Sequence, residues 1–239
     1  INFEDNTNDL VDYVAAADGI FSNTRAFFEN RKVIPKFKNS IAIRTILKSK
    51  PKLDIDEKNI NLIMGSNTHL VIYPVNKKSE LNLVCIVREK KFDPSNIRNL
   101  INNKILNQNQ NLDVLFQGDL KSWSLFSTKT TFPSSNKKVF YVGDAFHGFL
   151  PSMAQGASQS IESSYELFNL LKNDNQNAHN IYFKHRSERV KIIKRRSDFN
   201  FFVFHISNSF FKKIRNMLLK QLVKNNKFLR NYLGKVYKN

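Results

Sequence analysis

The sequence predicts a mixed α/β protein, and three stretches of the chain support this prediction. Residues 139–171 have the order of a strand, a loop and a helix. Residues 36–90 contain short β-rich runs separated by turn-forming residues, which is typical of a sheet. Residues 180–239 are basic and have apolar residues at helical spacing. We therefore expect an α/β part, a part built on a mixed or antiparallel β-sheet, and C-terminal helices.

The first of these stretches begins with the apolar run Val139 to Val142, which ends at Gly143-Asp144. A loop that contains Pro151 follows, and regular structure resumes at Gly156-Ala157. Apolar residues then recur at roughly helical spacing through Leu171, without Gly or Pro, and they include Ile161, Tyr165 and Leu167. The loop therefore leads from the end of a strand to the N-terminus of a helix at Gly156.

A helix N-terminus preceded by such a loop is suited to binding an electron-rich group. The first backbone N–H groups of a helix lack intrahelical partners, and the macrodipole is positive there. Gly156 lets a ligand approach the backbone closely because it has no side chain. Asp144 follows the strand at the edge where open α/β sheets bind ligands, and its carboxylate can accept hydrogen bonds from hydroxyl groups.

The same stretch resembles the second flavin fingerprint of the FAD-dependent aromatic hydroxylases. These are the single-component flavoprotein monooxygenases, which include salicylate-hydroxylase-like and ubiquinone-biosynthesis enzymes. The matching residues are Gly143-Asp144-Ala145-Phe146-His147, Pro151, Ala154-Gln155-Gly156-Ala157 and Ile161-Glu162.

The resemblance implies a role for each residue of the motif. Asp144, next to Gly143, would hold the ribityl chain of FAD. The turn at Gln155-Gly156-Ala157 would face the pyrimidine edge of the flavin, which becomes negatively charged on reduction. Pro151 would shape the loop near the reactive edge of the flavin.

The resemblance also implies the reaction and the fold. NAD(P)H would reduce FAD, O2 would react with the reduced flavin, and a small aromatic, phenolic substrate would be hydroxylated. The fold would be part of a Rossmann-like FAD-binding domain, together with a β-sheet substrate domain and C-terminal helices. We expect an incomplete FAD-binding domain at residues 1–30 and 128–175, the sheet domain at 31–127 and the helical segment at 176–239.

Family members begin with a βαβ unit that contains a G-x-G-x-x-G motif. The seven glycines of this chain include no such spacing, so we expect the sequence to be a fragment that lacks this N-terminal unit. Two further departures concern the flavin motif itself. Phe146 replaces a small residue, which we expect to narrow the loop, and Ser163 replaces a carboxylate expected on the helix surface. His147 also lies in the loop, and no carboxylate–His–Ser order in the sequence supports a role in nucleophilic catalysis.

A second motif lies near the start of the chain. An apolar run from Leu10 to Ala16 ends at Asp18-Gly19, and Arg25 follows. With the flavin motif downstream, this pattern resembles the DG motif of the same family, which contacts the flavin side and is implicated in NAD(P)H use. Asp18 and Arg25 are therefore candidate cofactor residues. The alternative is a turn at a strand end, with Arg25 paired locally.

Four β-rich runs form the predicted sheet, and two of them hold candidate substrate residues. The runs are 40–46, 60–64, 69–75 and 81–87, and we expect the last two to be antiparallel neighbours. His69 and Tyr73 are four residues apart and so share a face of their strand. By resemblance to hydroxybenzoate and salicylate hydroxylases they would contact the substrate, and His69 could help to deprotonate a phenol. The alternative is that both residues only pack; Arg44 is a weaker candidate for an anionic substrate.

Composition sets limits on the other classes of function. The chain has 239 residues, 41% of them hydrophobic, which indicates a globular protein. Its net charge of +18 would also suit a non-catalytic module that binds nucleic acid or another anion, but no basic block with interleaved aromatics supports a nucleic-acid partner. The single cysteine, Cys85, excludes an internal disulfide and a multi-cysteine metal site, and we expect no metal. Without a visible signal peptide or membrane-spanning run, a cytoplasmic location is expected.

Helices are predicted at 92–108, entered through Asp93-Pro94-Ser95, and at 181–196, 199–211 and 214–237. The C-terminal helices are basic and rich in Phe. Packing on the substrate domain is the first interpretation of these helices. The second is peripheral contact with anionic lipid, as would suit a ubiquinone-biosynthesis hydroxylase acting on a lipid-soluble substrate.

Overall fold

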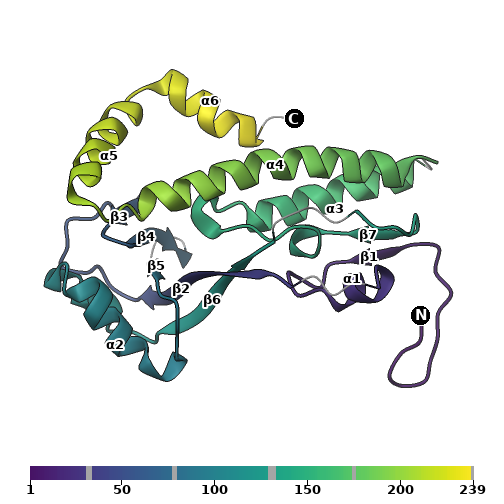
Figure 1. Cartoon of the computed structure of the whole chain (residues 1–239), viewed down its shortest axis with the longest axis horizontal. Coiled ribbons are helices and arrows are strands. Elements are labelled where there is room, and N and C mark those ends of the chain that lie inside the picture. Colours follow the sequence, from purple (N-terminus) through teal and green to yellow (C-terminus); the bar gives the residue numbers. More distant parts are fainter. Residues whose placement is uncertain (31–33, 77–79, 129–132, 174–175, 238–239) are drawn as a thin grey trace. The chain divides into compact units, whose positions relative to one another are not determined.

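The computed structural model describes residues 1–30, 34–76, 80–128, 133–173 and 176–237 (Figure 1). The chain divides into two compact units, and each is described here by itself. Unit 1 consists of Ile1–Lys36 and Phe126–Asp198, and unit 2 of Phe37–Leu125 and Phe199–Asn239. The divisions follow Lys36, Leu125 and Asp198, and the third division falls inside one long helix.

Unit 1 contains the predicted strand, loop and helix. Strand β7 (Val139–Tyr141) pairs in parallel with β1 (Val14–Ala16), and a short helix, α1 (Asn23–Phe28), follows β1. Only the last three residues of the apolar run from Leu10 form the strand, and Leu10 itself is fully exposed. The core of the unit is aromatic, and Tyr182 donates a hydrogen bond of 2.9 Å from its hydroxyl to the carbonyl of Tyr141.

Helix α3 (Gly156–Lys172) lies beside α4 (Ala178–Phe204), as Figure 1 shows. The helix was predicted correctly, and its buried face does not coincide with its apolar residues. Ile161, Tyr165 and Phe168 are exposed, whereas Gln159, Ser163 and Leu167 are buried.

The polar face of α3 is buried because it meets charged residues of α4. Arg186 is only 3% exposed, and it donates hydrogen bonds to Glu162 (2.7 Å), Glu166 (3.1 Å) and Gln159 (2.5 Å). Arg189 donates to Glu162 at 2.9 Å. Although partial burial opposes ionisation, these partners lower the pKa of Glu162. A paired and hydrogen-bonded charge can be buried at acceptable cost, so this network fixes α3 on α4.

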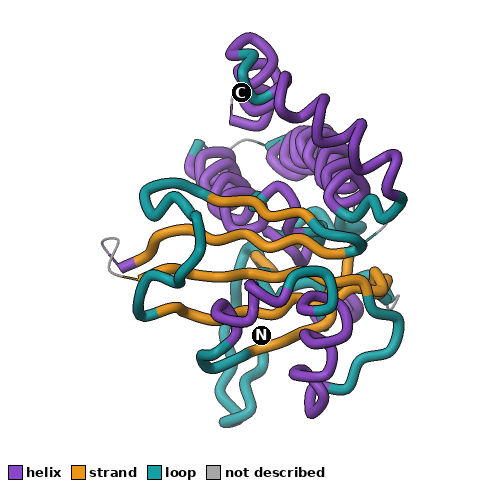
Figure 2. The backbone as a smooth tube through the Cα atoms, turned by 90° about the vertical axis from the view of Figure 1, so that its left-hand side faces the viewer, coloured by secondary structure: helices purple, strands orange, loops and turns teal. Residues whose placement is uncertain are grey.

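Unit 2 is built on a five-stranded sheet with the order β3-β4-β5-β2-β6 (Figure 2). Strands β4 and β5 are antiparallel neighbours, as predicted. The pairs β3–β4 and β2–β5 are also antiparallel. The bounds are β2 Lys36–Leu47, β3 Asn61–Met64, β4 Thr68–Val75, β5 Glu80–Arg88 and β6 Lys121–Ser127. Residues 77–79, where turn-forming residues separate the two predicted runs, lie outside the described residues.

One face of this sheet is hydrophobic and packs on a helical segment. Alternate residues of β4 and β5, such as Leu70, Ile72 and Leu83, join a cluster with residues of 100–116. The single helix predicted for 92–108 is instead a series: a 3-10 turn at Pro94–Asn96, α2 (Ile97–Ile101) and a π turn at Asn102–Leu106. The segment is rich in Asn, which favours caps and turns over a regular helix. The opposite face of the sheet presents His69, Tyr73, Asn82 and Arg44.

The C-terminal helices differ from the predicted ones in where they break. Helix α4 runs without interruption to Phe204, and α5 (Ser209–Leu222) and α6 (Asn226–Tyr237) follow. The break before α5 is fixed by Asn208, whose side chain caps the helix by accepting the N–H groups of Phe210 and Phe211. Within the described residues, none of the helices combines the length and the apolar character that crossing a membrane requires.

Candidate flavin site

The loop after β7 starts with a backbone turn that favours glycine. Gly143 has a φ of +59°, in the left-handed region. A Cβ atom on Gly143 would collide with the side chain of Ser160 on α3. Its N–H donates to Ser163 Oγ at 3.3 Å. The turn is therefore packed directly against α3, and it places Asp144 at its tip.

Asp144 is exposed, and within the described part of the chain it has no hydrogen-bond partner. The packed loop nevertheless removes part of the water around its carboxyl group, and this desolvation raises the pKa of Asp144. A partly desolvated carboxylate without a partner gains from accepting hydroxyl donors, so Asp144 is a ready ligand for a polyol chain.

Helix α3 begins at Gly156, as predicted. The N–H groups of Gly156 and Ala157 donate to no group in the described residues, as expected for the first turn of a helix. Gln155 precedes them and is 3% exposed. A Cβ atom built on Gly156 would meet nothing within 4 Å, so open space adjoins the backbone here. This helix end combines free donors, a positive dipole and room for a ligand.

The loop between these two points is held to α4. Ser197 Oγ donates to the carbonyl of Leu150 at 2.6 Å, and Ser152 Oγ donates to the carbonyl of Ser197 at 2.6 Å. Pro151, between the two anchored residues, is exposed. Both bonds fix the backbone on either side of Pro151, so the ring of Pro151 is presented at the surface of the loop.

The Asp18-Gly19 segment packs against the same loop. Arg25 is 1% exposed, and its guanidinium donates to the carbonyls of Ala145 and Ile20. Burial lowers the pKa of Arg25. The contacts of Arg25 are thus local, as in the alternative interpretation, but one of them is with the flavin loop. Arg25 therefore positions that loop.

Asp18 is exposed and accepts the N–H of Thr24 at 2.9 Å. Although burial opposes ionisation, hydrogen bonds from Ser22 and Thr24 lower the pKa of Asp18. Asp18 thus stays ionised at the start of α1, and a role in cofactor binding is still a prediction.

Three other residues of the motif are structural. His147 is buried, and its Nδ1 lies 3.0 Å from Thr128 Oγ1. Phe146 points into the aromatic core, with its ring 5.5 Å from that of Phe183, so the expected narrowing of the loop is not observed. Ser163 is 3% exposed, so the expectation of a surface carboxylate at this position was wrong.

His69 and Tyr73 lie in unit 2, on the polar face of β4. His69 is 1% exposed, and its Nδ1 lies 3.2 Å from Nε2 of His205. Burial, together with His205, lowers the pKa of His69 to about 3. These contacts favour the packing interpretation for His69. Tyr73 is half-buried, and its hydroxyl has no hydrogen-bond partner among the described residues.

The sequence prediction missed Asn82, which pairs with Tyr73 across the sheet. Asn82 is completely buried, and Arg44 Nε donates to its Oδ1 at 2.6 Å. Its Nδ2 has no acceptor in the described chain. The signal was present in the sequence, because Asn82 is the one polar residue inside the apolar run 81–87.

Comparison with known proteins decides the family. Residues 6–196, most of the chain, match the family model described as FAD binding domain. The chain belongs to this FAD-binding family. The predicted family is thereby confirmed, and so is the mixed α/β fold that it implied.

Relatives in this FAD-binding family include named monooxygenases. The chain is 29% identical over 188 residues to the FAD-dependent monooxygenase OpS4 of Beauveria bassiana, covering 67% of this chain and 41% of that protein. It is 24% identical over 216 residues to 6-hydroxynicotinate 3-monooxygenase of Bordetella bronchiseptica, covering 84% and 55%. The chain thus spans about half the length of the curated relatives it matches.

Solved structures agree on the fold. HpxO of Klebsiella pneumoniae, complexed with FAD and uric acid, matches 97% of this chain and 62% of that chain with a TM-score of 0.79 at 16% identity. A salicylate hydroxylase substrate complex matches 99% and 66% with a TM-score of 0.73 at 18% identity. The unpartnered Asp144 and the open helix end at Gly156 fit the FAD of this family.

Proposed function

We propose that this chain is part of a cytoplasmic FAD-dependent monooxygenase that hydroxylates a small aromatic, phenolic substrate with NAD(P)H and O2. The observation that carries the proposal is the pairing, in unit 1, of an unpartnered Asp144 carboxylate with the open N-terminus of α3 at Gly156. The family match and the named monooxygenases among the relatives support it.

FAD, when bound, supplies the acceptor for the hydride of NAD(P)H and the site at which O2 is activated. Asp144 would accept hydrogen bonds from the hydroxyls of the ribityl chain. The N–H groups of Gly156 and Ala157, beside Gln155, would stabilise the negative charge of the reduced flavin. Pro151 would shape the loop beside the flavin, and Arg25 holds that loop through Ala145. These residues bind and orient the cofactor, and the redox chemistry belongs to the flavin.

The polar face of the sheet in unit 2 supports an electron-rich substrate. Arg44 is exposed and forms no ion pair within the described residues, Asn82 keeps an unused buried N–H donor, and the hydroxyl of Tyr73 has no partner. These three donors lie on one face of neighbouring strands. An unsatisfied buried donor costs free energy, so an acceptor such as a phenolate or carboxylate would be stabilised on this face. We propose Tyr73 and Arg44 as substrate contacts, with His69 as the packing residue behind them.

A membrane-associated form of the same enzyme is the second candidate, in the manner of a ubiquinone-biosynthesis hydroxylase. From Phe199 to Asn239 the chain contains many Lys and Arg residues but no Asp or Glu. Phe202, Phe210 and Phe211 are more than half exposed in this segment. Exposed aromatic residues on a basic helical surface favour contact with anionic lipid. Co-sedimentation with anionic vesicles that Phe210→Ser/Phe211→Ser abolishes would support this candidate, whereas equal sedimentation of the variant would exclude it.

The proposed activity is tested with the protein produced from its whole reading frame and loaded with FAD. A panel of phenols and aromatic acids is screened for stimulated NAD(P)H oxidation, and the product is analysed for one added oxygen atom. Arg44→Met should raise KM for an acidic substrate, whereas Arg195→Met, at an exposed arginine of α4, should not. Failure of every substrate to stimulate NAD(P)H oxidation, with flavin bound, would contradict the hydroxylase proposal.

A further inference from the structure

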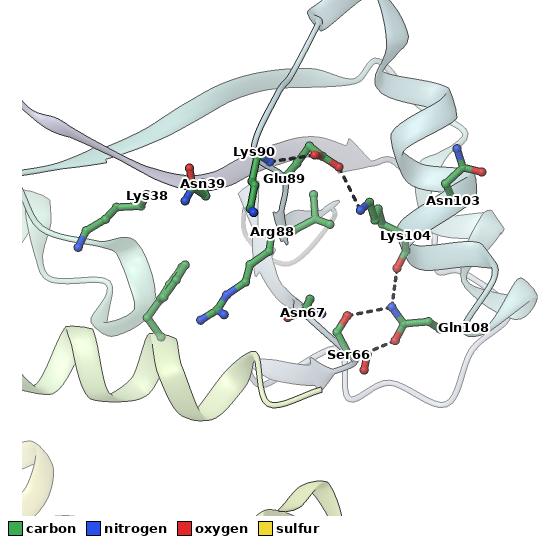
Figure 3. A pocket seen from close by; sticks show the side chains of 12 residues that line it. Lys38, Asn39, Ser66, Asn67, Arg88, Glu89, Lys90, Asn103, Lys104 and Gln108 are labelled. Atoms are coloured by element: carbon green, nitrogen blue, oxygen red, sulfur yellow. Dashed lines mark hydrogen bonds and ion pairs between the residues drawn. The ribbon is translucent and has the colours of Figure 1, made fainter. Parts of the chain in front are cut away.

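Unit 2 contains a cavity that is lined by none of the proposed flavin or substrate residues. Its volume is about 660 Å³, and it lies where β5 ends (Figure 3). All of its lining except Phe201 comes from four places in the chain: the start of β2, the turn before β4, the end of β5 with the two residues after it, and the helical segment 103–108. Phe201 of α4 adds an apolar wall.

The cavity has a strong excess of positive charge. Lys38, Arg88, Lys90 and Lys104 line it, against a single acid, Glu89. The carboxylate of Glu89 already forms an ion pair, because Lys104 Nζ lies 3.1 Å from it. Although partial burial opposes ionisation, the hydrogen bond from Lys104 and the N–H of Lys90 lower the pKa of Glu89. Glu89 therefore neutralises Lys104, and the positive charges of Arg88 and Lys90 are left to attract an anion.

Two of these cations have side-chain N–H donors that are available to a ligand. Among the described residues, the side chains of Arg88 and Lys90 form no hydrogen bond or ion pair, and Figure 3 shows both extending from the end of β5 without such contacts. The guanidinium carbon of Arg88 lies 5.6 Å from the centre of the Phe201 ring. Stacking of this kind orients the guanidinium plane and leaves its N–H groups available for an acceptor. Arg and Lys together offer eight N–H donors and no acceptor.

The rim of the cavity is fixed by hydrogen bonds in advance of any ligand. The N–H of Arg88 donates to the carbonyl of Asn67 at 2.9 Å, and the N–H of Glu89 donates to the carbonyl of Asn39 at 3.0 Å. Gln108 clamps the turn before β4 by accepting the N–H of Ser66 at 2.7 Å and donating to its carbonyl at 3.0 Å. Because these bonds already fix the backbone of the rim, binding of a ligand requires little further ordering of the backbone.

We propose that this cavity binds an organic phosphate of roughly nucleotide size. Phosphate oxygens accept from Arg and Lys at the same time, and charge-assisted bonds of this kind are the strong ones. A single inorganic phosphate would fill little of about 660 Å³, a volume within the usual range for small-molecule sites. The phosphates of a nicotinamide dinucleotide and those of another nucleotide share this chemistry. The proposal does not depend on the flavin chemistry, because direct binding can be measured without turnover.

The test is isothermal titration of the full-length protein with NADPH, ADP and inorganic pyrophosphate in 50 mM NaCl. The variants are Arg88→Gln and Lys90→Gln, and Lys91→Gln is the matched control, since Lys91 is the exposed neighbour that does not line the cavity. Each cavity variant should weaken binding by about tenfold or more, as expected for loss of a charge-assisted hydrogen bond. Circular dichroism and thermal unfolding establish that the variants fold, and Lys90→Arg should retain binding.

Binding of NADPH and ADP that both cavity variants weaken, and Lys91→Gln does not, supports the proposal. Tighter binding of NADPH than of ADP would identify the dinucleotide as the source of the phosphates, and the reverse would identify a simpler nucleotide. Two results would overturn the proposal: absence of saturable binding by all three probes at low salt, or an equal loss of affinity in Lys91→Gln.

Discussion

Replacing Gly143 by alanine should destabilise unit 1 at the turn that presents Asp144. The backbone of Gly143 has a φ of +59°, which costs an L-residue about 1–2 kcal/mol. The added methyl group would also collide with Ser160 on α3, and overpacking of this kind costs about 1–3 kcal/mol. The free energy of unfolding should therefore fall by about 2–5 kcal/mol.

Equilibrium unfolding in urea, followed by circular dichroism, measures this loss. Combining Gly143→Ala with Ser160→Ala removes the colliding hydroxyl, so the double variant should recover the steric part of the loss and keep the conformational part. Gly234→Ala is the control, because its methyl group would meet nothing within 4 Å and its place in α6 favours alanine by up to about 1 kcal/mol.

Two results would refute this reasoning. The first is a Gly143→Ala variant that unfolds within about 0.5 kcal/mol of the parent, the range expected for a substitution without a structural mechanism. The second is a double variant that is no more stable than Gly143→Ala alone, which would show that Ser160 is not the obstacle.

Three more predictions concern the cofactor, pH and the core. Gly156→Ala should leave the free energy of unfolding unchanged or slightly higher, because the added methyl group meets no protein atom. The same variant should weaken FAD binding by about tenfold or more in a fluorescence titration. Unchanged FAD affinity would contradict the proposed flavin site. His69 has a pKa of about 3 in the folded protein and about 6.5 in the unfolded chain. As the pH falls, the unfolded chain therefore takes up a proton before the folded protein does. The free energy of unfolding should fall by about 2 kcal/mol from pH 7 to pH 5. His69→Gln should flatten that pH dependence in urea unfolding, and an unaltered slope would exclude His69 as its source. Tyr182→Phe leaves the buried carbonyl of Tyr141 without its donor and should cost about 1–2 kcal/mol in thermal unfolding, whereas a neutral effect would show that the bond contributes little.

The parts of the fold that the sequence predicted correctly depend on local signals. The turn at Gly143-Asp144 and the helix start at Gly156 follow from residues next to each other in the chain. The pairing of β4 with β5 follows in the same way, because the two runs are consecutive and only a few residues apart in the sequence. Local chemistry was therefore enough to locate the flavin motif.

The features that were missed depend on distant partners. The apolar spacing of Ile161 and Tyr165 predicted the helix but could not show which face is buried, since Arg186, far along the chain, binds the polar side of α3. The unbroken course of α4 past Arg196 was missed for a different reason. No Gly or Pro marks its end, and the cap on the next helix comes from Asn208.

The visible absorption spectrum of the protein made from its whole reading frame, during titration with FAD, tests the central claim most directly. Asp144→Ala is compared with Asp12→Ala, which removes an exposed carboxylate of unit 1 outside the flavin motif. The account predicts a bound flavin spectrum in the parent and in Asp12→Ala, with affinity lost or strongly reduced in Asp144→Ala. Equal binding by the two variants, or a parent protein that FAD cannot reconstitute, would contradict it.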